Sequence, residues 1–213
     1  MAKVSPTRQA LLERKSRIEL AQQGRDLLEK KRAALMEEIL RAAQAVMHEA
    51  DELRQAASQA RRALARAETV AGPAAVRSAA LAARGEVPIE VTIVNVMGVR
   101  IPELEQRRVS RTKLERGYAP AGTSVTIDEA ASAFEGEVDA IIDLAESELR
   151  LRRLTDEIQS TSRRLNALDE VMIPRLERER DSIELALSER ERAEHFRLMR
   201  AKKMFERRRE QSK

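Results

Sequence analysis

The sequence predicts a mainly α-helical protein. A long N-terminal helix and a long C-terminal helix form an antiparallel two-helix coiled coil, and a small strand-containing head, a β-hairpin, lies in the middle of the chain. Three observations predict this fold class. Charged residues make up 36% of the 213 residues and aromatic residues only 2%, a composition typical of long helices and coiled coils. Apolar residues recur every seven positions near both ends of the chain. The segment between those ends is rich in Val and Ile.

We expect three segments: residues 1–70 as the N-terminal coiled-coil helix, residues 71–127 as the head with short strands and loops, and residues 128–213 as the C-terminal helix. Neither helix can bury its apolar seam alone, so the two helices are expected to pair within the chain as one shaft. Both ends of the chain are basic. Residues 1–32 hold nine Lys and Arg against four Asp and Glu, and residues 197–213 hold eight against two. Antiparallel pairing would bring these basic ends together.

The N-terminal helix is predicted from about Thr7 to Glu68, a stretch that contains no proline. Ser5 is the candidate N-cap, and Pro6 is the candidate first helical residue. The seven-residue repeat and its companion positions three residues further on indicate a coiled-coil seam over many turns. The seam residues on which this helix depends are Leu11, Ile18, Leu28 and Leu35.

The head is predicted from a change of pattern after the motif AGP at residues 71–73, which ends the first helix. Ile89, Val91 and Ile93 alternate with polar or smaller residues, and Gly98 separates them from a second apolar piece, Val99 and Ile101. Such a pattern indicates one or two short strands, most simply a hairpin. Its edge would be exposed. Thr126 or Asp128 is the candidate N-cap of the next helix.

The C-terminal helix is predicted from about Asp128 to Arg209. Its seam includes Leu165, Leu168, Met172, Ile183 and Phe196. Pro174 lies inside this pattern, and a proline removes a backbone hydrogen bond and clashes with the preceding turn. The simple interpretation is that the helix ends there. Because the apolar stripe continues beyond it, we expect a continuous helix with a kink at Pro174.

Residue types that carry out chemistry are not arranged for catalysis. There is no cysteine, no Gly-rich phosphate loop followed by Lys-Ser or Lys-Thr, and His48 lies far from His195 in sequence. We therefore expect no catalytic residues, no metal site and no cofactor. No apolar run approaches the roughly 20 residues that span a bilayer, and the first residues lack the apolar core of a signal peptide. The sequence thus predicts a soluble, intracellular type of protein.

Two blocks of sequence resemble the D subunit, the central rotor shaft, of the vacuolar- and archaeal-type (V-type and A-type) rotary ATPases. Residues 4–35 read VSPTRQALLERKSRIELAQQGRDLLEKKRAAL, with the family's PTR start, Gly-x-Asp-Leu-Leu and Lys-Arg. Residues 163–203 read RRLNALDEVMIPRLERERDSIELALSERERAEHFRLMRAKK, with its Ile-Pro, Glu-Arg-Glu-Arg and Phe-Arg-Leu landmarks. Asp169 departs from the family's usual Glu and Met199 from its common Lys, and the central segment resembles the family only in kind.

This resemblance implies a non-catalytic rotor subunit of the central stalk. It would transmit torque between ATP hydrolysis or synthesis in the catalytic ring and proton or sodium translocation in the membrane ring. The implied partners are the catalytic and regulatory nucleotide-binding subunits, the small F subunit of the central stalk, and the subunit that connects the shaft to the membrane rotor ring. The head is expected to dock on one of the latter two. The implied location is cytoplasmic and peripheral to the membrane, without direct membrane insertion. The residues implied to contact the catalytic ring are Arg8, Arg14, Lys15, Arg200, Lys202 and Lys203.

Three other functions remain open from the residues alone. The basic tail RLMRAKKMFERRREQSK could bind nucleic acid through phosphate contacts, although the acidic body and the scarcity of aromatic residues argue against nucleic acid as a partner. A structural coiled-coil scaffold would have the same seam. The shaft of the F-type synthases is a further possibility, but its central region is a larger α/β domain than the central segment here can form.

Overall fold

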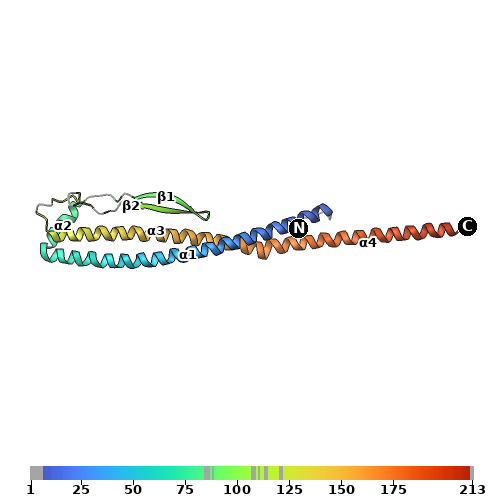
Figure 1. The fold of residues 1–213 in the computed structure, drawn as a ribbon, viewed down its shortest axis with the longest axis horizontal. Helices are drawn as coiled ribbons and strands as arrows, with labels where there is room; N and C mark the ends of the chain where they lie inside the picture. Colours follow the sequence, from blue (N-terminus) through green and yellow to red (C-terminus); the bar gives the residue numbers. More distant parts are fainter. Residues whose placement is uncertain are drawn as a thin grey trace. The chain divides into compact units, whose positions relative to one another are not determined.

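The structure is a computed structural model that describes residues 7–83, 87, 89–106, 109, 111–112, 115–119 and 122–211. Its elements, labelled in Figure 1, are α1 (Arg8–Ala71), α2 (Pro73–Ala82), β1 (Ile89–Val96), β2 (Val99–Gln106), α3 (Val125–Ala167), the π-helical turn η1 (Leu168–Met172) and α4 (Ile173–Gln211). The chain divides into two compact units. We call residues 1–32 with 160–213 the terminal unit and residues 33–159 the central unit.

Helix α1 begins at a side-chain cap. The Ala10 amide donates to the Thr7 hydroxyl at 3.1 Å, and the Leu11 amide donates to the Thr7 carbonyl at 3.1 Å. Thr7 therefore occupies the N-cap position, later in the chain than predicted. The predicted cap residues Ser5 and Pro6 lie outside the described residues.

The motif AGP ends α1 as expected. Gly72 has a φ of 84°, a left-handed conformation that glycine adopts without steric cost. Pro73 then occupies the first turn of α2, where its missing N–H leaves no helical bond unmade. Only strands and loops were predicted for the head, so helix α2 differs from the prediction.

The core of the central unit joins α1, β2 and α3. It contains Leu35 and Ala42 from α1, Val99 and Ile101 from β2, and Leu154 from α3. As the position along α1 rises, the partner position on α3 falls: Glu38 pairs with Arg150, Glu49 accepts from the Ser147 hydroxyl at 2.8 Å, and Arg66 approaches Glu129 at 3.8 Å. The two helices are therefore antiparallel in this unit, as Figure 1 also shows.

The predicted hairpin is confirmed. β1 and β2 are antiparallel, with Val96 opposite Val99 and Ile89 opposite Gln106. Met97 and Gly98 connect them and have φ values of 53° and 85°, which identifies the two-residue type I′ turn favoured in hairpins. The hairpin lies alongside α3 in Figure 1, with β2 nearer the helix. This order agrees with the burial of Val99 and Ile101.

A second apolar cluster forms where α1 ends. It is built mostly from small side chains: Ala67 of α1, Ala79 of α2, and Ile127 and Ala130 of α3. Because alanines replace the larger residues of the seam here, the backbones of neighbouring helices can approach closely. Helix α3 begins at Val125, and Ser124 is its cap, since the Ser124 hydroxyl lies 3.4 Å from the Thr126 amide. The expected caps, Thr126 and Asp128, lie within the helix.

The terminal unit pairs the start of α1 with the end of α3 and with α4. Arg8 contacts Glu191, Arg14 contacts Glu179, and Arg25 contacts Asp169. These contacts are again antiparallel. The buried apolar side chains of this unit, which form its seam, are Ile18, Leu165, Ile173 and Ile183.

Helical backbone continues without a break from Val125 to Gln211 and passes through the π-helical turn η1. The Ile173 amide bonds to the Leu168 carbonyl, five residues earlier. Pro174 follows at once, and its ring and missing N–H disfavour ordinary α-helical bonding in the preceding turn. The helix does not end at Pro174. Instead, the backbone departs from α-helical geometry in the wider π-helical turn η1 just before Pro174.

The π-helical turn moves the seam by one residue. Leu165 is buried, and the next buried apolar residue is Ile173, eight positions later rather than seven. The predicted seam residue Met172 is instead 51% exposed. The prediction was wrong because a π turn holds one more residue than an α turn.

Candidate partner-binding surfaces

The basic residues near the start of α1 are engaged within the terminal unit. The Arg14 Nε atom lies 2.8 Å from Glu179 Oε2, and the Arg14 side chain is only 14% exposed. Arg8 lies 2.8 Å from Glu191, and Lys15 lies 3.5 Å from Glu184. The guanidinium of Arg175, followed by that of Arg14, lowers the pKa of the Glu179 carboxyl. These three cations join two helices rather than form one free basic patch.

The basic residues of α4 have a different environment. Lys202 lies 3.9 Å from Glu206 on its own helix. Arg200 and Lys203 are exposed and make no ion pair with any side chain that the structure describes. Because α1 begins opposite Glu191, residues 200–203 lie roughly 14–18 Å further along α4. The structure therefore does not bring the two sets of predicted contact residues together.

The end of α4 also exposes large apolar side chains. Every residue from Glu191 to Arg207 is exposed, and Phe196 reaches 68%. Phe196 was predicted to belong to the seam. That prediction was wrong because no described residue of α1 lies opposite this part of α4. Arginines and lysines alternate with the apolar residues, which are Phe196, Leu198, Met199, Met204 and Phe205. We call residues 196–207 the α4 tip.

The hairpin presents two different faces. Val99 and Ile101 of β2 are 7% and 2% exposed, whereas Ile93 of β1 is 69% exposed. Ile89 and Val91 are exposed as well. The five predicted strand residues therefore divide into two that pack in the core and three that form an apolar surface.

Three further residues predicted to lie in the seam are half-buried: Leu11, Leu28 and Leu168.

A cluster of polar side chains ties the loop after β2 to α3. Arg116 is 6% exposed, and its guanidinium makes two hydrogen bonds to the Glu135 carboxylate at 2.9 and 2.8 Å. The Tyr118 hydroxyl donates to Asp128 at 2.8 Å, and burial raises the pKa of that hydroxyl. The hydrogen bonds to Glu135 raise the pKa of Arg116, which therefore stays charged. The sequence pattern does not predict this cluster, because Arg116 and Glu135 meet only where the loop folds back onto α3.

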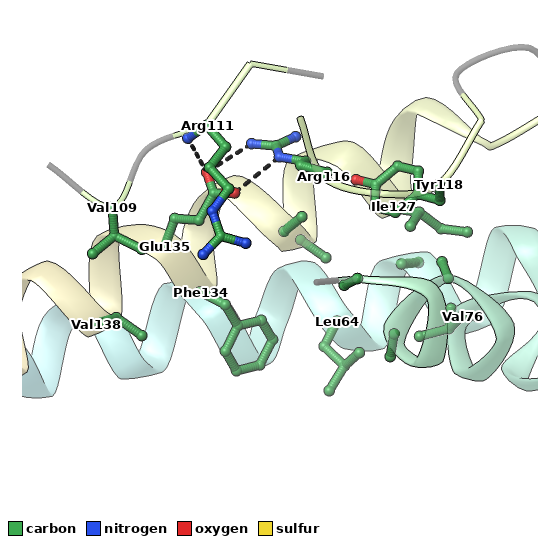
Figure 2. Close-up of a pocket in the computed structure, with 16 residues that line it drawn as sticks. Leu64, Val76, Val109, Arg111, Arg116, Tyr118, Ile127, Phe134, Glu135 and Val138 are labelled. Carbon is green, nitrogen blue, oxygen red and sulfur yellow. Dashed lines mark hydrogen bonds and ion pairs between the residues drawn. The ribbon is translucent and has the colours of Figure 1, made fainter. Parts of the chain in front are cut away.

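A cavity of about 340 Å³ lies under this loop. Figure 2 shows Arg111 and Arg116 converging on Glu135, above a floor that includes Phe134 and Leu64. The lining is mainly apolar and comes from α1, α2, α3 and the loop itself. Its charged members are held by one another: Arg116 bonds Glu135, and the Arg111 amide donates to the same carboxylate at 3.3 Å. The arrangement fastens the loop to α3.

Two further features of the described part of the chain bear on its chemistry. It contains no group of His, Asp or Glu residues placed to hold a metal ion. None of its helices is both long and apolar enough to cross a membrane.

Known proteins are similar to this chain along almost its whole length. A family model described as the D subunit of ATP synthase matches residues 10–203. The chain is 40% identical to the A-type ATP synthase D subunit of Methanoregula boonei over 199 residues, which cover 93% of this chain and 95% of that protein. It is 41% identical over 203 residues to the protein of the same name from Thermococcus gammatolerans, with 95% of each chain covered. With that of Methanopyrus kandleri the identity is 41% over 211 residues, covering 96% of this chain and 88% of the relative.

Proposed function

The chain belongs to the family of ATP synthase D subunits, and from that premise we propose that it is the central-stalk rotor subunit of a V/A-type rotary ATPase. It transmits torque between ATP hydrolysis or synthesis in the catalytic ring and proton or sodium translocation in the membrane ring. It is not itself catalytic. The observation that carries this proposal is the match over residues 10–203, which includes both coiled-coil halves and the head.

The paired helices support a mechanical role. A rod that transmits torque must resist twisting, and two helices joined along their length resist it better than one. Ion pairs between the helices occur in both units, including Arg14 with Glu179 and Arg150 with Glu38. Apolar seams lie beside these pairs, with Ile18 and Leu154 among the buried residues. The chain thus has the internal contacts that a shaft needs.

An asymmetric shaft can give identical catalytic sites different affinities for nucleotide. A round rod would contact every catalytic site equally, whereas an irregular one makes different contacts with each, which links rotation to nucleotide affinity. The π-helical turn before Pro174 makes the second helix locally irregular. In our proposal this irregularity contributes to the asymmetry of the shaft.

We assign the contact with the nucleotide-binding subunits to the α4 tip. Arg200, Lys202 and Lys203 supply positive charge there, and Phe205 supplies an exposed apolar surface. Arg8, Arg14 and Lys15 serve instead to join α1 to α4. The head contacts the small F subunit or the subunit that connects the shaft to the membrane ring. The location is cytoplasmic and peripheral to the membrane, as part of the complex.

Co-purification with the tagged chain tests the proposal. We expect the catalytic and regulatory nucleotide-binding subunits and the small F subunit to co-purify in fixed stoichiometry. A second candidate function, nucleic-acid binding, is favoured only by the basic residues of the α4 tip. A gel-shift at physiological salt distinguishes the two: tight binding to DNA without co-purified ATPase subunits would overturn the assignment as a rotor subunit.

A further inference from the structure

The two strands of the hairpin have different outer edges. In a two-residue type I′ hairpin the residues that flank the turn, Val96 and Val99, hydrogen-bond to each other, and every second pair beyond them does the same. The intervening residues point their backbone N–H and C=O groups away from the partner strand. On β1 these outward residues are Ile89, Val91, Ile93 and Asn95, and on β2 they are Arg100, Pro102, Leu104 and Gln106.

The outer edge of β2 is protected. Pro102 has no N–H to offer, and proline on an edge is a common device against strand pairing. Pro102 and Leu104 on this edge are both half-buried. The inner side chains of β2, Val99 and Ile101, are buried in the core. A further strand cannot add to this edge without removing these features.

The outer edge of β1 has no such protection. Its outward amides have no hydrogen-bond partner among the residues that the structure describes. β1 contains no proline, lysine or arginine, and its only charged residue is Glu90. Its side chains are exposed on both faces, with Ile93 at 69% and Val94 at 36%. Val96, at the turn end of β1, packs against the core. The rest of the outer edge of β1 therefore presents an open row of donors and acceptors.

We propose that β1 binds an extended segment of another rotating stalk subunit, which adds to the hairpin as a third strand. This inference rests on the proposed function. The segment carries apolar side chains at alternate positions, because Ile89, Val91 and Ile93 would form one apolar face with them. It also carries basic residues, because the hairpin has three glutamates, at positions 90, 103 and 105, against the single arginine Arg100.

A rotating partner fits strand addition better than the catalytic ring does. A ladder of backbone hydrogen bonds must break as a unit when a strand leaves. A contact with successive subunits of a stationary ring would have to break at every step of rotation. A contact with a subunit that turns together with this chain remains in place.

Hydrogen–deuterium exchange at single-residue resolution tests the proposal. The full chain is compared alone and within the purified intact ATPase complex. We expect the amides of Val91, Ile93 and Asn95 to exchange roughly tenfold or more slowly in the complex. The outward amide of Arg100 on β2 serves as the control and should change far less. If the chain is in the complex and the β1 amides are not slowed, strand addition is wrong. If the chain does not enter the complex, the proposed function fails instead.

Matched variants separate the edge from the side chains. Ile93→Pro removes an outward N–H together with the isoleucine side chain, and Pro102, directly opposite Ile93, shows that the hairpin accommodates proline at this pair. We expect it to reduce the protection of Val91 and Asn95 about three- to tenfold, the effect of one backbone hydrogen bond. Pro102→Ile, which restores a donor on the β2 edge, should leave that protection unchanged. Ile93→Thr keeps the donor and should cost less than Ile93→Pro.

Three outcomes would overturn the proposal. Equal losses in Ile93→Thr and Ile93→Pro would show that the partner binds the apolar face alone. Protection of β1 in the isolated chain, together with a dimer in sedimentation, would identify a second copy as the occupant. Cross-links from a cysteine placed at Asn95 to the nucleotide-binding subunits would exclude a rotating partner.

Discussion

Arg14 and Glu179 lie 165 positions apart in the chain, yet the Nε atom of one is 2.8 Å from the Oε2 atom of the other. This contact joins the start of α1 to α4 beside the buried Ile18 and Ile183. Its position shows how the two ends of the sequence form one antiparallel unit. It also shows why Arg14 is a poor candidate for a partner contact.

Substitution of either member of this pair should weaken the terminal unit. In a double-mutant cycle of Arg14→Ala and Glu179→Ala, we expect a coupling free energy of about 0.5–1 kcal/mol, measured by urea unfolding of the full chain. The control pair, Arg17 with Glu13 on one helix, is largely exposed and should couple by less than about 0.5 kcal/mol. Equal coupling in the two pairs would contradict the assignment.

The pair of Arg14 and Glu179 also predicts that the unfolding free energy depends on pH in the acid range. Arg175 and Arg14 hold the pKa of Glu179 below its usual value of 4.5 in the folded chain. As the pH falls, Glu179 takes up its proton in the unfolded chain at a higher pH than in the folded chain. Its contribution to the unfolding free energy is therefore complete above the unfolded-state pKa and is lost as the pH falls through the lowered folded-state pKa. Glu179→Gln should therefore flatten the pH dependence of the unfolding free energy in this acid range. An unchanged slope would contradict the prediction.

The buried pair of Arg116 and Glu135 should be far more sensitive to substitution. Glu135→Gln removes the nearer of two carboxylates from a guanidinium that is 7% exposed, leaving Asp128 at 3.5 Å, and we expect a loss of about 3 kcal/mol in unfolding free energy. Arg66→Met removes an exposed pair with Glu129 at 3.8 Å and should cost less than about 1 kcal/mol. Comparable losses in the two variants would show that the loop is not fastened by Arg116.

One substitution should stabilise the protein. The Thr161 hydroxyl is buried, with 1% of the residue exposed, and has no hydrogen-bond partner among the described residues. Thr161→Val keeps the shape and removes the unpaired group, so we expect a gain of about 1 kcal/mol by thermal or urea unfolding. Thr155→Val is the control, because the Thr155 hydroxyl bonds the Leu151 carbonyl at 2.8 Å. That variant should be neutral or slightly destabilising. A loss of stability in Thr161→Val would contradict the prediction.

The α4 tip should matter for assembly and not for folding. Phe205 is 68% exposed, so Phe205→Ser should change the unfolding free energy of the isolated chain by less than about 0.5 kcal/mol. In reconstitution with the catalytic ring, measured by ATPase activity and co-elution, we expect weaker binding by about tenfold or more. Leu81→Ser, at a similarly exposed apolar residue on α2, is the control and should bind the ring normally.

The sequence was informative where local pattern decides structure. The seven-residue repeat identified Ile18, Leu35, Leu165 and Ile183, which are all buried. Gly72 ends one helix and Pro73 begins the next, because glycine readily adopts a positive φ and proline suits the first turn of a helix. The hairpin followed from the alternation around Ile93 and from Gly98. In each case neighbouring residues carry the signal.

The sequence was less informative where contacts between distant parts of the chain decide the structure. The π-helical turn replaces Met172 with Ile173 in the seam, and a fixed seven-residue repeat cannot show an added residue. Phe196 continues the repeat, but no described α1 residue lies opposite it. Arg116 and Glu135 meet only because the loop folds onto α3, so their spacing in sequence carries no signal.

The most direct test of the account is to observe whether the chain turns. It contains no cysteine, so a single Arg54→Cys substitution on the exposed face of α1 gives one site for a bead. With the catalytic ring fixed to a surface, we predict that added ATP drives continuous rotation of the bead in one direction. ATP hydrolysis by the same assembled complex with a stationary or randomly moving bead would contradict the assignment of this chain as a rotor.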